Sequence, residues 1–444
     1  MAPADLKKEG PSFDLSIALA YLLASKQIFF DSSGKVFFGE LALDGKLRAI
    51  KGALALVKNA KKAGFKEVFV PKGNAKEAAL IDGLKIFGCE KLEDITNHFK
   101  RENGVKLSQQ PPTKIDLGKI HGEALYDFSD IKGQETAKRG LEIAAAGGHN
   151  VLMIGPAGTG KTMLAKAFSS VLPPLSFDEI LEITSIHSVA GALEGDFVLH
   201  RPFRNPHHTS SYVALVGGGV YPKPGEITLS HRGVLFLDEF PEFERRVIEA
   251  LRQPIEDGLI NIARAKGSIT FPAKFIMVCT MNPCPCGNYG SKTKTCVCSQ
   301  GSLMRYKRKI SGPIVDRIDL WLEVPQVEYN KLSDATGQGE FSASIQARII
   351  KAREIQRERF SGALKHTHSE RIMTNSEMGV KELKKFALLS DNIKNILNQA
   401  AVKLDLSGRA YHKVIKIART IADLAGEENI KEEHLLEALQ YRPK

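Results

Sequence analysis

Gly155-Pro-Ala-Gly-Thr-Gly-Lys-Thr162 is the stretch that decides the fold of this 444-residue chain. It matches the G-x-x-x-x-G-K-[ST] pattern of a phosphate-binding loop, in which glycines let the backbone fold tightly so that several NH groups point into one concavity. Lys161 can place a positive charge beside the β- and γ-phosphates, and the Thr162 hydroxyl can ligate Mg²⁺. We expect every residue of the loop to contact the nucleotide: Gly155, Pro156, Ala157, Gly158, Thr159, Gly160, Lys161 and Thr162.

The residues on either side of this loop predict a strand and a helix. Residues 150–154 form a short apolar run, which is typical of a buried parallel strand. Residues 163–168 have helical character, so that a bound phosphate would lie at a helix N-terminus, where free NH groups and the helix dipole favour an anion. The sequence therefore predicts an α/β core with a parallel sheet flanked by helices.

Two further apolar runs end in polar side chains. Gly233-Val-Leu-Phe-Leu-Asp-Glu239 is an apolar strand that ends in two carboxylates, the Walker B pattern. We expect Asp238 to hold Mg²⁺ through its waters and Glu239 to orient and deprotonate the attacking water. Acidic residues also end strands by chance, but downstream of a phosphate-binding loop they favour an ATP hydrolase. The next apolar run, residues 275–280, leads to Asn282.

Composition and charge narrow the choice of partners. The net charge is +11, which favours an anionic partner such as DNA, although a lysine-rich solvated surface is the alternative. No apolar run approaches the roughly 20 residues that span a bilayer, so we expect no membrane contact. The first residues lack the charged and apolar regions of an export signal, and we therefore predict a cytoplasmic protein.

Four of the six cysteines lie in one short segment, at Cys284, Cys286, Cys296 and Cys298. Two C-x-C pairs separated by a polar loop could place four thiolates around one tetrahedral Zn²⁺. Disulfide pairing and free thiols are the alternatives. If a metal is bound, we expect a structural site without an open coordination position.

Several of these stretches resemble P-loop ATPases of the AAA+ type. Residues 130–134 are similar to an I-x-G-Q stretch that lies against adenine in that class, which assigns Ile131 and Gly133 to the ATP site. Asn282 matches the polar residue called sensor 1, which hydrogen-bonds the γ-phosphate or the attacking water. The resemblance implies ATP and Mg²⁺ as cofactors.

Two arginines match residues that act on the γ-phosphate in that class. Residues 313–320 resemble the D-R-[FI] stretch of magnesium chelatase and replicative helicase motors, where the arginine, here Arg317, enters the site of a neighbouring subunit. Arg409, in the first turn of a helix that we expect Ser407 to cap, resembles the sensor 2 arginine of the lid, which reaches the γ-phosphate when the lid closes. Ordinary ion pairs are the alternative for both. An arginine that acts in trans implies a homo-oligomeric ring.

Two segments of the core suggest loops that contact a partner. The string from Arg201 to Thr209 resembles a signature of the ComM/YifB family of magnesium-chelatase-like ATPases. It contains His207 and His208, but neighbours on a strand face opposite ways, so we favour a pore or subunit-interface loop over a metal site. Residues 259–270 predict a hairpin with Arg264 and Lys266 near its tip. In the helicases that the core resembles, such a hairpin touches DNA in the pore, so the resemblance implies contacts of these two residues to DNA phosphates. The basic helix over residues 346–359 favours a solvated face, with DNA contact as the alternative.

The N-terminal segment resembles the proteolytic domain of Lon-type proteases through Glu9-Gly10-Pro11-Ser12, residues 39–45 and residues 63–74. Ser12 falls on the nucleophile position of that family, but Leu54 replaces the lysine that would take its proton. We therefore predict a non-proteolytic α+β module. The resemblance begins inside the family pattern, so we expect the module to be incomplete.

The predicted organisation is a partial Lon-like module over residues 1–104, a linker over 105–120, an AAA+ core over 121–328 and an all-α lid over 329–444. This combination is similar to the ComM/YifB family, whose members are implicated in natural transformation as hexameric motors that migrate DNA branches. The resemblance implies an ATP-driven DNA translocase or branch-migration helicase. A magnesium-chelatase-type or chaperone-like ATPase that remodels protein is the alternative.

Overall fold

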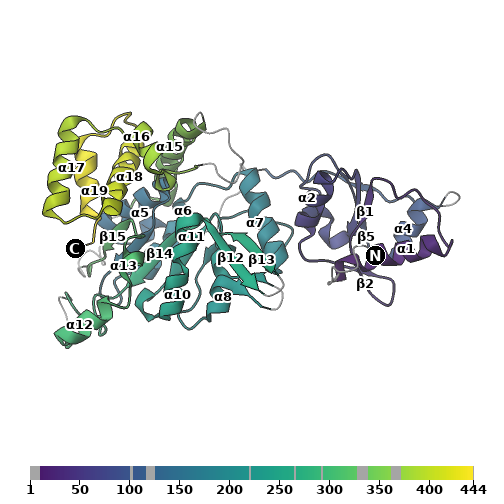
Figure 1. The fold of residues 1–444 in the computed structure, drawn as a ribbon, viewed down its shortest axis with the longest axis horizontal. Helices are drawn as coiled ribbons and strands as arrows, with labels where there is room; N and C mark the ends of the chain where they lie inside the picture. Colours follow the sequence, from purple (N-terminus) through teal and green to yellow (C-terminus); the bar gives the residue numbers. More distant parts are fainter. Residues whose placement is uncertain are drawn as a thin grey trace. The chain divides into compact units, whose positions relative to one another are not determined.

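The computed structural model describes residues 11–100, 104–116, 126–219, 222–264, 267–291, 294–327, 339–361 and 372–443. The chain divides into two compact units, which contain the helices and strands labelled in Figure 1. The first unit comprises residues 1–120 together with 175–200, and the second comprises 121–174 together with 201–444. Helix α7 (Phe177–Ala190) therefore belongs to the N-terminal unit and packs on α2, although it follows the phosphate-binding loop in sequence.

The first unit is built on a four-stranded sheet in the order β1-β4-β5-β6, with β1, β4 and β5 parallel and β6 antiparallel. Side chains alternate along β4, so that Val68 and Val70 join one apolar cluster with α2 and Phe69 joins the other. Phe69 stacks between Phe37 and Phe87, with ring centroids 4.7 and 4.8 Å away. Both faces of the sheet are therefore covered. The elements are β1 (Lys35–Phe37), β2 (Glu40–Leu41), β3 (Leu47–Arg48), β4 (Glu67–Pro71), β5 (Lys85–Cys89), β6 (Gln109–Gln110), α1 (Asp14–Ala24), α2 (Ala53–Lys62), α3 (Ala75–Ala78) and α4 (Leu92–Phe99).

Part of the predicted linker lies in this sheet. Gln109 and Gln110 form β6, which pairs with β5, and the Thr113 NH donates to the Ala79 carbonyl at 3.0 Å. The physical reason is that β5 would otherwise expose an unpaired strand edge, and a short polar strand can cover that edge. The two residues at the Lon-like catalytic positions lie in different elements. Ser12, at the nucleophile position, is in a 3-10 turn (Pro11–Phe13), and Leu54, at the lysine position, is 1% exposed within α2.

The second unit is built on a five-stranded parallel sheet in the order β15-β7-β14-β11-β8. Along β11, Val234 and Phe236 pack into one apolar cluster, whereas Leu235 and Leu237 pack into another. The sheet is thus buried on both faces, as the continuous apolar runs predict. The strands are β7 (Val151–Ile154), β8 (Phe203–Arg204), β11 (Val234–Leu237), β14 (Ile276–Met281) and β15 (Leu320–Glu323).

The segment that contains the string from Arg201 to Thr209 contributes to this sheet. Its strand β8 pairs with β11 and forms the edge of the sheet. Arg201 holds the residues before β8 in place, because its guanidinium donates to the carbonyl of Pro173 at 2.6 Å and to that of Arg232 at 2.6 Å. The other elements of the core are α5 (Glu135–Gly147), α6 (Lys161–Val171), α8 (Tyr212–Val216), β9 (Gly217–Gly218), β10 (Lys223–Pro224), α9 (Glu226–Leu229), α10 (Arg245–Ala250), α11 (Arg252–Asp257), β12 (Leu259–Arg264), β13 (Gly267–Pro272), α12 (Gln300–Lys307) and α13 (Gly312–Val315).

The C-terminal part is helical, as predicted. Helix α18 is the centre of this part, since it contacts α19, α5 and α15 (Figure 1). Ser407 caps α18, where its side chain accepts the Ala410 NH. The helices are α15 (Ser342–Ser361), α16 (Val380–Phe386), α17 (Asp391–Lys403), α18 (Gly408–Leu424) and α19 (Glu432–Gln440).

The expectation of a solvated basic face on α15 is wrong for three of its arginines. Arg353 donates to the carbonyl of Ala145 at 2.8 Å, Arg348 to Glu142 Oε1 at 2.6 Å, and Arg359 to Asp423 Oδ2 at 2.9 Å. The last turn of α5 has carbonyls without helical partners, and an arginine from a packed helix can satisfy them. Among the described residues, no helix has the length and apolar character needed to cross a membrane.

Candidate nucleotide-binding site

The parallel sheet brings the predicted site together. The phosphate-binding loop follows β7, the acidic pair follows β11, and Asn282 follows β14. Strand β14 lies between β7 and β11, so the carboxyl ends of all three strands meet at one edge. Ligands of open parallel sheets bind in the crevice outside this edge.

Glycines are required in the loop for two different reasons. A Cβ on Gly155 would lie 2.1 Å from the Val324 carbonyl oxygen, so no side chain fits there. Gly158 and Gly160 have φ angles of +76° and +91°, which L side chains rarely adopt. Helix α6 begins at Lys161, directly after the glycines, and its first turn directs NH groups at the loop.

The Lys161 ammonium is held inside the loop. Its Nζ lies 2.7 Å from the Gly155 carbonyl, 2.8 Å from the Pro156 carbonyl and 3.1 Å from Asn282 Oδ1. Burial lowers the pKa of Lys161, while the charges of Asp238 and Glu239 act in the opposite direction. The lysine and Asn282 can therefore act on the same phosphate oxygen.

Asp238 and Thr162 form the centre where Mg²⁺ can bind. The Thr162 hydroxyl donates to Asp238 Oδ2 at 3.1 Å, and the Thr280 hydroxyl donates to Asp238 Oδ1. The hydroxyl and the carboxylate supply the oxygen ligands that Mg²⁺ prefers. Glu239 follows with a left-handed backbone, φ +52° and ψ +46°, and its NH donates to Thr280 Oγ1 at 3.1 Å.

The two adjacent histidines lie in a turn and not on a strand, so the expectation that their rings diverge is wrong. The ring centroids of His207 and His208 are 4.1 Å apart, because the chain leaves β8 after Arg204 and bends. His208 Nδ1 lies 3.9 Å from Glu239 Oε2, and His207 Nδ1 lies 2.8 Å from the Thr209 hydroxyl. The histidine string therefore adjoins the carboxylate of Glu239.

The predicted adenine stretch reaches the loop through Gln134. Its side-chain NH₂ donates to the Pro325 carbonyl at 2.6 Å and to the Thr159 carbonyl at 3.3 Å. Ile131 is 5% exposed and packs in the core, and a Cβ on Gly133 would lie 3.5 Å from Val327. The stretch thus lies beside the phosphate-binding loop.

Arg317 and Arg409 both contact one carboxylate, that of Glu256. Arg409 lies 3.3 Å from Glu256 Oε1, and Arg317 donates to Glu256 Oε2 and to the Pro313 carbonyl at 2.7 Å. The hydrogen bond from Arg317 and the two guanidinium charges lower the pKa of Glu256. Asn150, which precedes β7, donates to the Arg317 carbonyl at 3.3 Å, whereas the loop follows β7.

The predicted hairpin is present as β12 and β13, which pair from Leu259 with Pro272 to Arg264 with Gly267. Lys266 lies outside the described residues, and only the backbone of Arg264 is described.

The four clustered cysteines converge. Their Sγ atoms all lie within 4.8 Å of one another. The Sγ atom of Cys284 lies 3.4 Å from that of Cys286 and 3.7 Å from that of Cys296. Hydrogen bonds from the backbone NH groups of Asn288 and Val297 lower the pKa of the Cys286 thiol to about 6.

Sequence reasoning missed four residues of this region: Thr280, which bridges Asp238 and the Glu239 backbone; Gln134; Glu256, which holds both arginines; and His208 beside Glu239. Gln134, His208 and Thr280 lie in stretches that the sequence analysis singled out, whereas Glu256 lies in none of them.

The sheet order, the loop and the acidic pair define the class as a P-loop ATPase of the AAA+ type. Models of the family match three parts of the chain: "Magnesium chelatase, subunit ChlI" at residues 127–332, its C-terminal domain at 339–442 and "Subunit ChlI of Mg-chelatase" at 1–74. The protein belongs to the ComM/YifB family of magnesium-chelatase-like ATPases.

Relatives of known name agree with this assignment. The competence protein ComM of Haemophilus influenzae is 43% identical over 448 residues, covering 100% of this chain and 84% of the relative. YifB of Salmonella typhimurium is 42% identical over 447 residues with the same coverage. The magnesium-chelatase 38 kDa subunit of Cereibacter sphaeroides is 26% identical over 176 residues, covering 36% of this chain and 53% of that subunit.

Proposed function

We propose that this protein is a ring-forming motor that hydrolyses ATP to translocate DNA or migrate DNA branches, in the manner of a transformation and recombination helicase. The observation that supports it most is the assembled hydrolytic edge, where Lys161, Thr162, Asp238, Glu239 and Asn282 meet. Thr162 and Asp238 would hold Mg²⁺, and Glu239 would orient and deprotonate the attacking water. The reaction would take place in the cytoplasm.

The position of the two arginines supports the proposal of a ring. Arg317 and Arg409 both pair with Glu256, beside the amino end of β7, and the described contacts link neither to the phosphate-binding loop of their own chain. We propose that both reach the γ-phosphate bound by a neighbouring subunit. This differs from the expectation that Arg409 acts when its own lid closes. A closed ring, which we propose to be a hexamer, would complete every site.

DNA is the partner that the charge and the relatives favour. The chain has a net charge of +11, and one relative bears the name competence protein. The hairpin of β12 and β13 would present Arg264 and Lys266 to the phosphate backbone. Such contacts are independent of base sequence and weaken as salt rises.

The test is ATP hydrolysis by the purified protein with and without single-stranded and branched DNA, at low and at moderate salt. Glu239→Gln is the control for the hydrolytic site, and Arg264→Ala combined with Lys266→Ala is the variant for the hairpin. Stimulation by DNA that the hairpin variant loses, with basal hydrolysis retained, supports the proposal. Hydrolysis that ignores DNA at low salt refutes the DNA motor.

A protein-remodelling ATPase is the second candidate. It is favoured by the match of the magnesium chelatase models to both the core and the helical lid. DNA-independent hydrolysis would support this candidate. The Lon-like segment has Leu54 at the lysine position, and we expect no cleavage of casein by the purified protein. As cofactors we propose ATP, Mg²⁺ and one Zn²⁺ at the four cysteines.

A further inference from the structure

We infer that the four cysteines form a structural zinc site that positions Asn282 and the phosphate-binding loop, so that metal occupancy controls ATP hydrolysis. The inference rests on the proposed ATPase function, and it assigns the metal a role in that function. The cluster is formed by Cys284, Cys286, Cys296 and Cys298 and is called the cysteine knuckle below.

The sulfur geometry matches a tetrahedral thiolate site. With Zn–S bonds of about 2.3 Å, the edges of an ideal tetrahedron are about 3.8 Å. Three of the measured Sγ–Sγ distances are 3.4, 3.7 and 3.7 Å, among Cys284, Cys286 and Cys296. A disulfide requires about 2.05 Å, and all four thiols are unbridged. Four soft sulfur ligands in this geometry select Zn²⁺ over Mg²⁺.

Backbone NH groups surround the sulfurs. The Tyr289 NH lies 3.3 Å from Cys284 Sγ, and the NH groups of Asn288 and Val297 donate to Cys286. Metal-bound thiolates retain negative charge, and NH donors of this kind stabilise that charge and orient the ligands. On binding, each thiol would release its proton to solvent and its sulfur would bond to the metal.

The cysteine knuckle adjoins the nucleotide site. Cys284 follows Asn282 by two residues and is fully buried. The Gly287 NH donates to the Cys284 carbonyl at 3.0 Å and closes the turn. A Cβ on Gly287 would lie 3.6 Å from the Ala157 Cβ and 3.9 Å from Asn282 Cγ. The turn at Gly287 therefore lies close to Ala157 of the phosphate-binding loop and to Asn282, which contacts Lys161.

A second contact fixes the same residue. The Tyr306 hydroxyl, on α12, hydrogen-bonds the backbone of Asn282, and Tyr306 is 5% exposed. The chain between Asn282 and α12 contains the entire cysteine knuckle. A metal bound to the four cysteines would cross-link residues 284 to 298 and fix the shape of this loop. Without that cross-link the loop would become less ordered, and Asn282 would be positioned less firmly against Lys161. A displacement of about 1 Å in such a group can reduce the rate up to about 100-fold.

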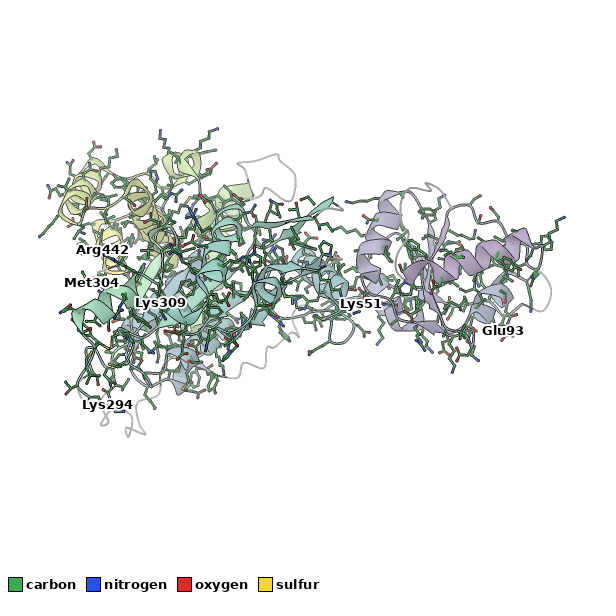
Figure 2. All side chains as sticks on the ribbon, turned by 60° about the horizontal axis from the view of Figure 1, so that its bottom comes forward. Lys51, Glu93, Lys294, Met304, Lys309 and Arg442 are labelled. Carbon is green, nitrogen blue, oxygen red and sulfur yellow. The ribbon has the colours of Figure 1, made fainter. Side chains whose placement is uncertain are left out.

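The site is accessible to reagents. Cys286, Cys296 and Cys298 are partly exposed, and the nearby Lys294, between Cys286 and Cys296, and Met304, after Cys298, extend to the surface of the second unit (Figure 2). A chelator can therefore remove the metal from folded protein.

The experiment uses the full chain and begins with metal content. We expect elemental mass spectrometry to find one zinc ion per chain. After exchange of the metal for Co²⁺, we expect the absorption spectrum to show thiolate-to-cobalt charge-transfer bands and the d–d bands of a tetrahedral site. Cys298→Ser should lose the metal, whereas Cys89→Ala, which removes a buried thiol of the first unit, should retain it. Protein without bound metal and without the Co²⁺ spectrum overturns the site.

The second measurement tests the role of the metal. Removal of the metal from the wild-type protein with a chelator, with Mg²⁺ kept in excess, should lower the rate of ATP hydrolysis about 10- to 100-fold. Addition of Zn²⁺ should restore that rate. Circular dichroism checks that the fold is retained in the stripped protein. This reversible step does not depend on the folding of a variant. Unchanged hydrolysis in stripped protein overturns the role of the metal. If the zinc-loaded protein does not hydrolyse ATP at all, the proposed function fails, but metal content and binding of a fluorescent nucleotide still test the site.

Discussion

Asp423 is a buried carboxylate that lies between two arginines of the helical lid, and its neutralisation should destabilise the lid strongly. The side chain of Asp423 has no exposed surface, and those of Arg419 and Arg359 are 3% and 14% exposed. Its oxygens lie 3.0 Å from Arg419 Nε, 2.9 Å from Arg359 and 2.7 Å from Asn375 Nδ2. Asp423→Asn keeps the volume but leaves two buried guanidinium groups without a counter-charge.

The expected magnitude follows from this burial. Breaking a buried ion pair by removing one partner costs about 3–5 kcal/mol. A domain of this size loses about 2–4 °C of melting temperature per kcal/mol, so the transition of the second unit should fall by about 6–20 °C. Differential scanning calorimetry of the wild-type protein and the variant measures this change in melting temperature. Because Asp423 and Arg409 lie on the same helix, α18, ATP hydrolysis should become heat-sensitive in parallel.

The matched control is Asp391→Asn in the same lid. Asp391 pairs with Lys394 at 3.1 Å, but its side chain is 96% exposed. Exposed pairs contribute little, so we expect a shift of no more than about 2 °C. Equal shifts in the two variants, or a shift below about 2 °C for Asp423→Asn, would show that the buried network does not stabilise the lid.

Three further predictions concern the site and pH. Gly155→Ala should abolish binding of a fluorescent nucleotide, because the added Cβ would lie 2.1 Å from the Val324 carbonyl oxygen, whereas Gly301→Ala adds a Cβ with nothing within 4 Å and should bind normally. Glu239→Gln should bind nucleotide but hydrolyse it about 10²- to 10⁴-fold more slowly in a steady-state assay, and wild-type turnover in this variant would remove the proposed base. Burial lowers the pKa of His149, so the unfolded chain binds more protons, and the melting temperature should fall as pH drops below about 6.5. His149→Gln should flatten the dependence of the melting temperature on pH. Identical pH profiles of the wild-type protein and this variant would contradict the assignment of the dependence to His149.

The features that the sequence predicts correctly are those formed by contiguous residues. The loop from Gly155 to Thr162 has its own geometry, because glycine conformation and the following helix are local properties. The same holds for the apolar strands β7, β11 and β14 and for the Ser407 cap of α18. The match to family models then agrees with the α/β fold that these local signals predict.

Other features depend on which strands become neighbours. Thr280 reaches Glu239 across 41 residues of sequence only because β14 pairs with β11. Glu256 on α11 meets Arg409 on α18 across 153 residues, and only the folded chain brings these two side chains together. Such contacts depend on sheet order and helix packing, which leave no mark in the local pattern of either partner.

The sequence by itself thus determined the phosphate-binding loop, the acidic pair and the presence of four clustered cysteines, since residue type and spacing are sufficient for each. Only the tertiary structure decided that α7 packs with the N-terminal unit, that the arginines share Glu256, and that the turn at Gly287 lies close to Ala157 and Asn282. The physical reason is that burial and hydrogen bonding between distant segments are properties of the packed chain, and neither partner can satisfy them alone.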